Sequence, residues 1–233
     1  MLILGIDSTA VTASVAIAEI EDSVKTYSLF TVKNRLTHSE NLMPMIKQAV
    51  ELYGLKIADL SLIAVSAGPG SFTGVRIGVS TVKGLAFTSD GKIPCAAVST
   101  LEALAENLSH QSGIICPIMD ARRQQFYNAM FRYNKRLCED RLISANELME
   151  ELDKLDENIT LCGDGADLFA SIYNLKTTSN IKVSSVLTKD QNALSVAICG
   201  YRALQENKLI SAKELKPIYL RASQAEREKS GLE

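Results

Sequence analysis

A glycine-rich stretch, VSAGPGSFTGVRIG at 65–78, is of the kind that can hold a phosphate before a helix. It fails the Walker A spacing, because Gly74 is followed by Val75 where a lysine is needed. It also fails the dinucleotide spacing, since Thr73 stands where the third glycine belongs. Two interpretations remain open: an anion site at a helix N-terminus, and a plain structural turn with Ser71 or Thr73 as the helix cap.

An aspartate recurs at the end of two apolar runs. LILGIDSTAVTASVAIAEI contains Asp7 and IICPIMDARRQQFYNAMFRY contains Asp120, and each aspartate is followed by polar residues and a second run. The pattern predicts two β-hairpins in related halves of the chain. Aspartate is also favoured in turns for local reasons, so the residues alone leave both duplication and coincidence open.

Residues that bind metals are sparse. The only histidines, His38 and His110, are far apart in the sequence, and we interpret His38 as the residue before a helix cap. The five cysteines contain no CxxC pair and lie mostly in apolar segments, which predicts buried free thiols in a reducing compartment. They are Cys95, Cys116, Cys138, Cys162 and Cys199.

The composition is that of an ordinary globular protein. The 233 residues are 46% hydrophobic and 22% charged, with a formal net charge of -2. This charge argues against a protein that binds nucleic acid unaided, so any RNA contact would be local or shared with a partner. MLILGIDSTA lacks the basic start of a signal peptide, and no apolar run approaches the ~20 residues of a membrane helix. We therefore expect a cytoplasmic protein with no membrane partner.

The apolar patterns predict an α/β protein with two lobes, 1–98 and 99–221. The last predicted helix, 192–207, could pack back on the first lobe. The tail, 222–233, is charged and poor in apolar residues, which is typical of disorder. Strands are expected at 2–6, 11–20, 24–32, 60–66, 93–98 and 159–162, and in the second hairpin; further helices are expected at 38–53, 72–87 and 145–155.

Five motifs, in order, resemble the TsaB family, also called YeaZ. They are GIDST near the N-terminus, HSENLMPMI from His38, AGPGSFTGVRIG from Ala67, MDARRQQFY from Met119 and KPIYLR from Lys216. The resemblance implies the actin, Hsp70 and sugar-kinase type of fold, with two related α/β lobes. It also implies a role in making threonylcarbamoyladenosine, the modified base beside the anticodon of tRNAs that read codons starting with A.

The resemblance implies partners for this chain. TsaB-like proteins pair with TsaD, a catalytic relative of the same fold, and self-associate as homodimers in its absence. A TsaE-like ATPase also binds the assembly, and tRNA is the substrate of the complex. We therefore expect a non-catalytic scaffold subunit without a cofactor of its own, while the wider complex uses ATP. Whether this chain touches tRNA stays open.

The metal-binding HxxxH pair of TsaD falls on VSTLEAL at 98–104 of this chain. Thr100 and Leu104 replace its two histidines, and neither a hydroxyl nor an alkyl side chain can replace imidazole as a metal ligand. Glu102 is retained, and we interpret it as an ordinary residue of a helix surface. The sequence thus predicts no metal and excludes a metalloprotease.

The nucleotide-binding pattern of the fold is matched only in part. Asp7-Ser8-Thr9 fits the first phosphate hairpin, whereas Arg122 and Arg123 follow Asp120 where glycine and threonine are expected. Gly163-Asp164-Gly165 is either a remnant of the adenosine loop or a plain turn. The weak candidates for a cofactor site are Asp7, Ser8, Thr9, Asp120, Gly163 and Gly165. The alternative function is a small ATPase or kinase of this fold.

Two predicted helices carry more apolar surface than one lobe requires. The helix at 72–87 is apolar around most of its circumference, and the helix at 38–53 has methionines outside its main apolar face. Burial within the lobe and contact with a partner are equal interpretations from the residues, and the resemblance favours the partner. The glycine loop would then set the angle at which the helix leaves its strand. The expected interface residues are Met43, Met45, Phe72, Val75, Arg76, Val79, Val82 and Lys83.

Overall fold

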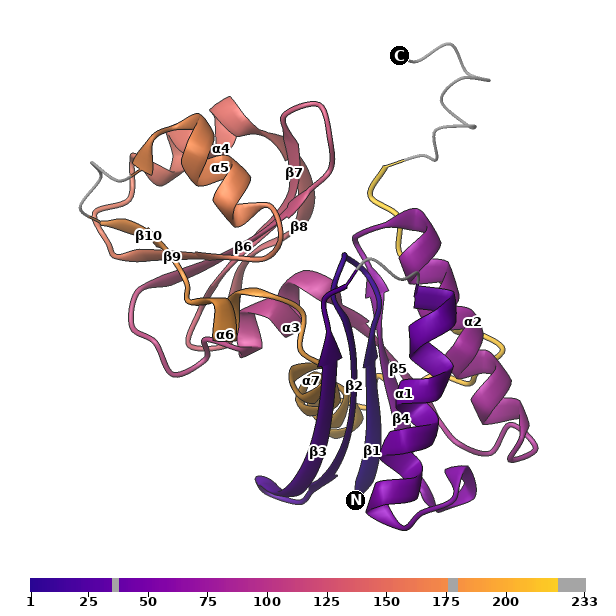
Figure 1. Ribbon diagram of the computed structural model, residues 1–233. Helices are drawn as coiled ribbons and strands as arrows, with labels where there is room; N and C mark the ends of the chain where they lie inside the picture. The colour runs from indigo at the N-terminus through magenta and orange to yellow at the C-terminus, as the bar shows by residue number, and fades with distance from the viewer. Residues whose placement is uncertain (35–37, 176–179, 222–233) are drawn as a thin grey trace.

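Two five-stranded sheets, one in each lobe, form the framework of the protein (Figure 1). The computed structural model describes residues 1–34, 38–175 and 180–221. The predicted disordered tail, 222–233, lies outside these residues.

The first sheet has the strand order β3-β2-β1-β4-β5. Its first three strands are antiparallel neighbours, whereas β4 and β5 continue from β1 in parallel. The strands at its centre are buried on both faces, which explains their nearly continuous apolar sequences. The bounds are β1 (Leu2–Asp7), β2 (Ala13–Ile20), β3 (Val24–Val32), β4 (Leu62–Gly68) and β5 (Cys95–Ser99).

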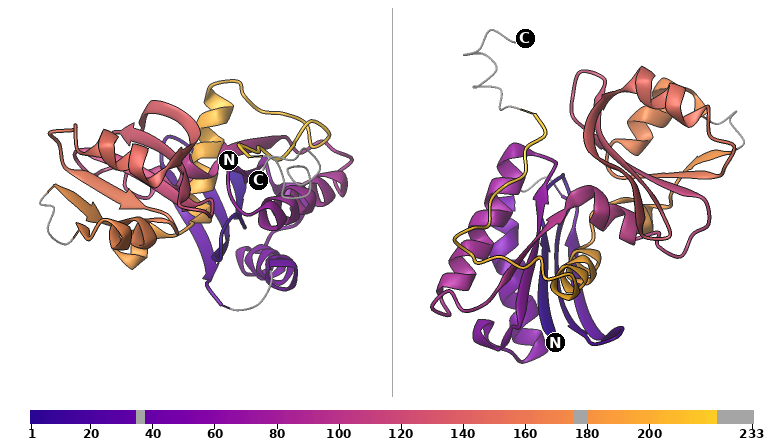
Figure 2. Two further views of the ribbon diagram at one scale, coloured as in Figure 1. Left: turned by 90° about the horizontal axis from the view of Figure 1, so that it is seen from above. Right: turned by 180° about the vertical axis from the view of Figure 1, so that it is seen from behind.

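Helices cover both faces of this sheet (Figure 2). Because successive strand residues point to opposite faces, Ile3 and Leu4 belong to different cores. The core around Leu4 contains residues of α1 (His38–Tyr53) and α2 (Phe72–Phe87). The core around Ile3 contains residues of α7 (Ala193–Gln205), so the last helix packs on the first lobe.

The second sheet, β10-β9-β6-β7-β8, repeats the topology of the first. Its hairpin strands β7 and β8 follow β6 in antiparallel order, and β9 and β10 extend the sheet in parallel. Of the two interpretations that the aspartate turns left open, the structure confirms the duplication, which the family resemblance also implied. The bounds are β6 (Ile114–Asp120), β7 (Gln125–Arg132), β8 (Lys135–Ser144), β9 (Ile159–Cys162) and β10 (Ile181–Val183).

The second sheet is also covered on both faces. Residues of α4 and α5 join one core with Phe126, and residues of α3 join the other with Tyr127. Two short helices serve as connections: η1 leads into β4, and α6 lies between β10 and α7. The bounds are α3 (Thr100–Glu106), α4 (Ala145–Leu152), α5 (Ala166–Ile172), α6 (Val186–Lys189) and η1 (Ile57–Asp59).

The predicted helices at 38–53 and 72–87 are confirmed at their stated bounds. The predicted strand at 11–20 begins later, at Ala13, because Val11 lies in the hairpin turn and is exposed. The prediction that His38 precedes a helix cap is wrong, since α1 begins at His38 itself.

The glycine-rich stretch seats the start of α2 against the β1–β2 turn. A Cβ added to Gly74 would lie 2.0 Å from the carbonyl oxygen of Ser8, so only glycine fits there. The Ser8 hydroxyl donates to the carbonyl oxygen of Gly74 at 2.9 Å, and Ser71 caps the helix. The glycine-rich stretch therefore serves to pack the start of α2 against the β1–β2 turn within the first lobe.

We expect Gly74→Ala to destabilise the protein by about 3 kcal/mol, because the backbone of the turn cannot move away without breaking its own bonds. Gly84→Ala is the matched control in the same helix, since an added Cβ there meets nothing within 4 Å. It should stabilise by about 0.5–1 kcal/mol. Urea unfolding of both variants measures the difference, and equal stabilities would contradict the close contact.

Candidate functional site

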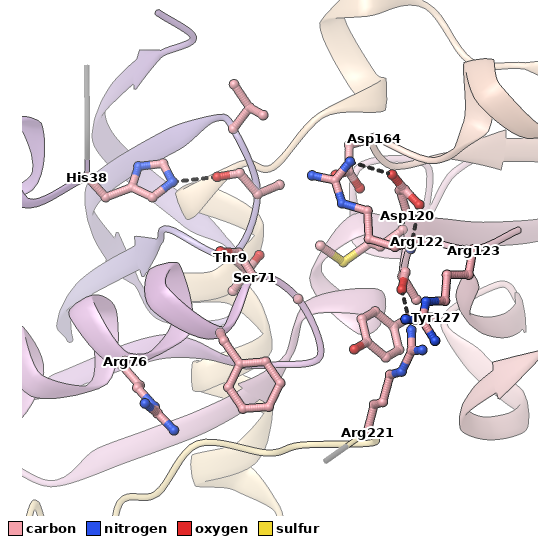
Figure 3. A pocket seen from close by; sticks show the side chains of 16 residues that line it. Thr9, His38, Ser71, Arg76, Asp120, Arg122, Arg123, Tyr127, Asp164 and Arg221 are labelled. Carbon is pink, nitrogen blue, oxygen red and sulfur yellow. Dashed lines mark hydrogen bonds and ion pairs between the residues drawn. The ribbon is translucent and has the colours of Figure 1, made fainter. Parts of the chain in front are cut away.

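A pocket of about 700 Å³ lies between the lobes (Figure 3). The first lobe contributes the turn after β1 and the start of α2, including Thr9 and Phe72. The second lobe contributes the β6–β7 turn and Asp164, and Arg221 at the end of the described chain completes the wall. A volume of this size is sufficient for a small organic ligand.

Asp7 lies beneath this pocket and does not line it. Its carboxylate accepts bonds from the backbone and hydroxyl of Thr9, at 2.9 and 2.7 Å, and from the Ser66 hydroxyl at 2.6 Å. Burial raises the pKa of Asp7 above its ordinary value, although these bonds act in the opposite direction. The structure therefore corrects the candidate set: Asp7 and Ser8 are engaged inside the lobe, and only Thr9 of the three borders the pocket.

The second turn has a similar local geometry. The Asp120 carboxylate accepts a bond from the backbone of Arg122 at 2.7 Å, just as Asp7 accepts one from Thr9. It also pairs with the Arg122 guanidinium at 3.3 Å. Asp120 and Arg122 both line the pocket, so the predicted candidate Asp120 does lie in the site.

The loop after β9 positions Asp164, which sequence reasoning did not single out. Gly163 and Gly165 flank it, and an added Cβ at either would lie within 3 Å of the β6–β7 hairpin or the strand leading into it. These glycines permit close packing, and neither lines the pocket, whereas Asp164 does. The loss of hydration in the cleft and the negative charge of the nearby Asp120 carboxylate raise the pKa of Asp164 to about 6. The sequence signal that could have identified Asp164 is an aspartate between two glycines directly after a predicted strand.

The two histidines do not form a common site. The His38 ring lies at the edge of the pocket and its Nε2 contacts the carbonyl oxygen of Ala10, which ties α1 to the β1–β2 turn. His110 does not line this pocket. Among residues 1–34, 38–175 and 180–221, no cluster of three or more His, Cys, Asp or Glu is arranged to hold a metal ion.

The positions that align with the metal pair of TsaD lie in a core. Thr100 and Leu104 are fully buried on α3, away from the pocket. Glu102, between them, pairs with Arg136 and Arg202, which agrees with its interpretation as an ordinary helix-surface residue.

The cysteines are free thiols, as predicted, and four of the five are buried. Burial raises the pKa of the Cys116 thiol to about 12. Cys138 differs, because it lies half-buried on the edge strand β8.

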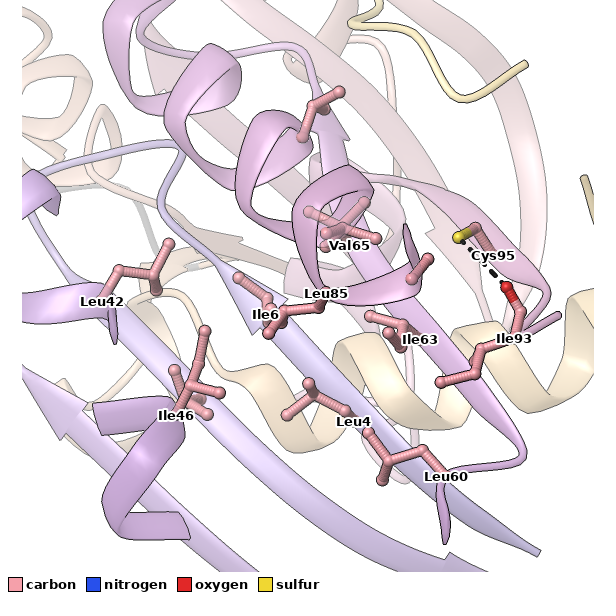
Figure 4. Packing of buried hydrophobic residues seen from close by; sticks show 14 of the residues in the cluster. Leu4, Ile6, Leu42, Ile46, Leu60, Ile63, Val65, Leu85, Ile93 and Cys95 are labelled. Carbon is pink, nitrogen blue, oxygen red and sulfur yellow. Dashed lines mark hydrogen bonds between the residues drawn. The ribbon is translucent and has the colours of Figure 1, made fainter. Parts of the chain in front are cut away.

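Four of the eight residues predicted to contact a partner are instead buried in the core of the first lobe. The side chains of α1 and α2 that face the first sheet fill its core with Ile6 and Val65 (Figure 4). They are buried within their own lobe, so no partner can reach them in this conformation. The misassigned residues are Met45, Val75, Val79 and Val82.

The remaining predicted residues lie at the surface. Met43 on α1 is 49% exposed, Arg76 is exposed, and Phe72 and Lys83 are half-buried. Phe72 stacks on Tyr219 with ring centroids 4.4 Å apart, and Arg76 Nε donates to the Tyr219 hydroxyl at 2.8 Å. The KPIYLR motif thus supplies a residue of this surface that sequence reasoning missed.

We expect Asp164→Asn to stabilise the protein at pH 7.5 by about 1 kcal/mol after allowance for solvent screening. A raised carboxyl pKa means that the folded state holds a proton that the unfolded state has lost between about pH 4 and pH 6. The wild type therefore loses stability as the pH rises through that window, and the variant does not. Unfolding measured from pH 4 to pH 8 tests this, and a constant difference across the range would contradict it.

Within the described residues, no helix has the length and apolar character needed to cross a membrane.

Comparison with known proteins gives consistent matches. The family model of TsaD, tRNA N6-adenosine threonylcarbamoyltransferase, matches residues 33–229. The tRNA threonylcarbamoyladenosine biosynthesis protein TsaB of Bacillus subtilis is 32% identical over 230 residues, which are 97% of this chain and 96% of the relative.

Solved structures agree on the fold. YeaZ from Pseudomonas aeruginosa has a TM-score of 0.74 and 20% identity, covering 94% of this chain and 99% of that chain. Component A of (R)-2-hydroxyglutaryl-CoA dehydratase from Acidaminococcus fermentans has a TM-score of 0.50 and 13% identity, covering 88% and 99%. These structures share the fold of this chain, with its two related α/β lobes. The TsaB-named relatives indicate a role in tRNA threonylcarbamoyladenosine biosynthesis. The chain belongs to the TsaB (YeaZ) family.

Proposed function

We propose that this chain is a non-catalytic scaffold subunit that pairs with a TsaD-like enzyme. That enzyme transfers threonylcarbamoyl to the adenosine beside the tRNA anticodon. On this proposal a TsaE-like ATPase joins the assembly, the wider complex uses ATP, and the chain alone forms homodimers. We also propose a cytoplasmic location, because the named relatives take part in tRNA modification.

The internal hydrogen bonds of the β1–β2 turn are the observation that supports a non-catalytic role. In an active member of the fold, this turn would offer its polar groups to a nucleotide. Here the Ser8 hydroxyl donates to the carbonyl oxygen of Gly74, and the backbone N–H and hydroxyl of Thr9 donate to the buried Asp7 carboxylate at 2.9 and 2.7 Å. A phosphate would have to break these bonds, and the cost of leaving such buried groups unpaired opposes it.

The second support comes from Thr100 and Leu104, the two positions that align with the metal-binding histidines of TsaD. Thr100 and Leu104 face a core and offer no imidazole, so the chemistry that TsaD assigns to its histidines has no counterpart at these residues. A TsaD-like partner would supply that chemistry, which is why the proposal is a shared assembly.

The outer surface of α1 and α2 supports the partner. After the correction above, it consists of Met43, Phe72, Arg76 and Lys83, joined by Tyr219. An exposed methionine and aromatic rings beside arginine are side chains that interfaces favour. The two basic residues suit an acidic patch on the partner.

The alternative, a small ATPase or kinase, draws support from the pocket between the lobes. We expect the purified chain alone to hydrolyse ATP no faster than a protein-free blank, because its first hairpin is occupied by internal bonds. A phosphate-release assay measures this. Turnover that Asp7→Ala abolishes in a folded variant would favour the alternative.

The partner surface is tested by Met43→Glu and Arg76→Glu. Both variants should remain folded, because Met43 is exposed and the loss of the Arg76 hydrogen bond to the Tyr219 hydroxyl should cost only about 1 kcal/mol. At least one should weaken binding to the TsaD-like subunit about thirtyfold, as expected for the loss of an anchor of ~2 kcal/mol. Sedimentation of each variant, alone and mixed with the partner, provides the measurement.

Val79→Glu is the control for this experiment. Its side chain is in the core, so an unpaired carboxylate should destabilise the fold by several kcal/mol. If both surface variants bind the partner like the wild type while remaining folded, this face is not the contact surface.

A further inference from the structure

Two helices, α3 and α7, lie in contact between the two sheets (Figure 1 and Figure 2). Residues of α7 share a core with the first sheet, and most buried residues of α3 share a core with the second. Ala103 of α3 joins the core around α7 instead. The contact between these helices therefore connects the two lobes.

Polar side chains fasten the two helices to each other. Ser195 and Arg202 are seven residues apart on α7, which places them on one face of the helix. The Ser195 hydroxyl donates to Asn107 Oδ1 at 2.6 Å. The Arg202 guanidinium donates to Glu106 at 2.8 Å and to Glu102 at 3.4 Å. Because hydrogen bonds are directional, these contacts favour one position of α7 relative to α3.

Glu102 also connects α3 with the edge strand of the second sheet. Its carboxylate lies 3.7 Å from the guanidinium of Arg136 on β8, and Arg136 pairs with Asp140 on the same strand. Asp140 accepts a hydrogen bond from the Ser99 hydroxyl at 2.5 Å, and Ser99 is the last residue of β5 in the first sheet. A continuous network thus runs from β5 through β8 and α3 to α7.

This network is only partly exposed to solvent. The side chain of Glu106 is 9% exposed, and the side chains of Glu102 and Arg202 are about one third exposed. Isolated ion pairs on a surface contribute little, but partly buried charges that share several partners are screened less by water and salt. The network is therefore suited to resist a movement of one lobe against the other.

The network lies apart from the pocket between the lobes. None of its charged residues lines that pocket, which is bordered by the β1–β2 turn, the β6–β7 turn and Arg221. It therefore restrains the angle between the lobes without filling the space between them. The charged residues are Glu102, Glu106, Arg136, Asp140 and Arg202.

We propose that Glu102 and Arg202 form an ionic clamp that holds the two lobes at a fixed angle, with Arg136 and Asp140 extending the clamp to β8. Glu102 is the central positioning residue, because its two arginine partners come from different lobes. A chain clamped in this way moves as one rigid body, so the pocket keeps one width. This inference goes beyond the scaffold role and does not depend on it, because it uses no residue of α1 or α2.

The test measures distances between spin labels on the two lobes of the full chain. Val11→Cys places one label in the β1–β2 turn, and Leu168→Cys places the other on α5, since both positions are exposed. Cys138→Ser removes the half-buried thiol, and the other four native cysteines are buried. Pulsed electron paramagnetic resonance gives the distance distribution, with excess unlabelled protein so that only distances within one chain contribute.

The clamp is broken by Glu102→Gln and, separately, by Arg202→Gln. Glu102→Gln keeps the size of the side chain and should fold, because Arg202 retains Glu106 and Arg136 retains Asp140. Arg132→Gln is the matched control, since it removes an ion pair with Glu157 that lies within the second lobe. Thermal melting checks that each variant is folded.

We expect one narrow distribution for the wild type and for the Arg132→Gln control. Both clamp variants should broaden or shift it by about 5 Å, the distance by which one packed helix moves a full turn past another. The wild type should broaden in the same direction at 1 M sodium chloride, where the screening length is about 3 Å. This last measurement needs no variant to fold.

A wild type with a broad distribution at low salt would overturn the proposal, as would a folded Glu102→Gln variant with the distribution of the wild type. Equal broadening in Arg132→Gln would also overturn it, because a general loosening would then explain the effect. Sedimentation of Glu102→Gln with the TsaD-like partner is measured in parallel. Partner binding should be unchanged, so a failure of the scaffold role is distinguished from a failure of the clamp.

Discussion

The contact between the start of α2 and the β1–β2 turn determines what the first lobe can do. Glycine at position 74 lets the helix backbone approach Ser8, and the hydroxyl and carbonyl groups of the turn are then used within the lobe. A turn engaged in this way holds the helix at a fixed angle. It also removes the polar groups that a nucleotide would need on this side of the pocket. The same contact thus favours a rigid binding surface over a catalytic site.

The two lobes share a topology but differ at this contact. Each lobe has a turn in which an aspartate accepts a bond from the backbone two residues later, and a loop with two glycines that packs beside it. In the first lobe, the second glycine, Gly70, is followed by a long helix seated on the turn. In the second lobe the turn carries arginines in left-handed conformations that reach the pocket. The positive charge at the pocket therefore comes from this turn, from Arg221 of the C-terminal segment and from Arg76 of α2.

Much of the fold could be predicted from the sequence because it depends on local patterns. The helices at 38–53 and 72–87 have clear limits, and the repeated aspartate offered duplication as one of two interpretations. β8 and β10 were not predicted. β8 is an edge strand with many charged residues, and β10 has only three residues, so neither gives a clear alternating pattern.

The site was harder to predict, because burial depends on the whole lobe. Val75 and Val79 are apolar on a helix that is apolar nearly all round, and the sequence cannot say which side the sheet covers. Tyr219 and Arg221 reach α2 and the pocket only because the C-terminal segment returns across the first lobe to the second. Contacts over such separations leave no periodic signal.

The most direct test of the scaffold role is the threonylcarbamoyladenosine content of tRNA in a reconstituted reaction. The reaction contains the TsaE-like ATPase, threonylcarbamoyl-adenylate and a TsaD-like subunit, either intact or with its metal-binding histidines replaced. Modification should require both this chain and the intact TsaD-like subunit. Modification at the same rate without this chain, or in its presence when the partner lacks its metal site, would contradict the account.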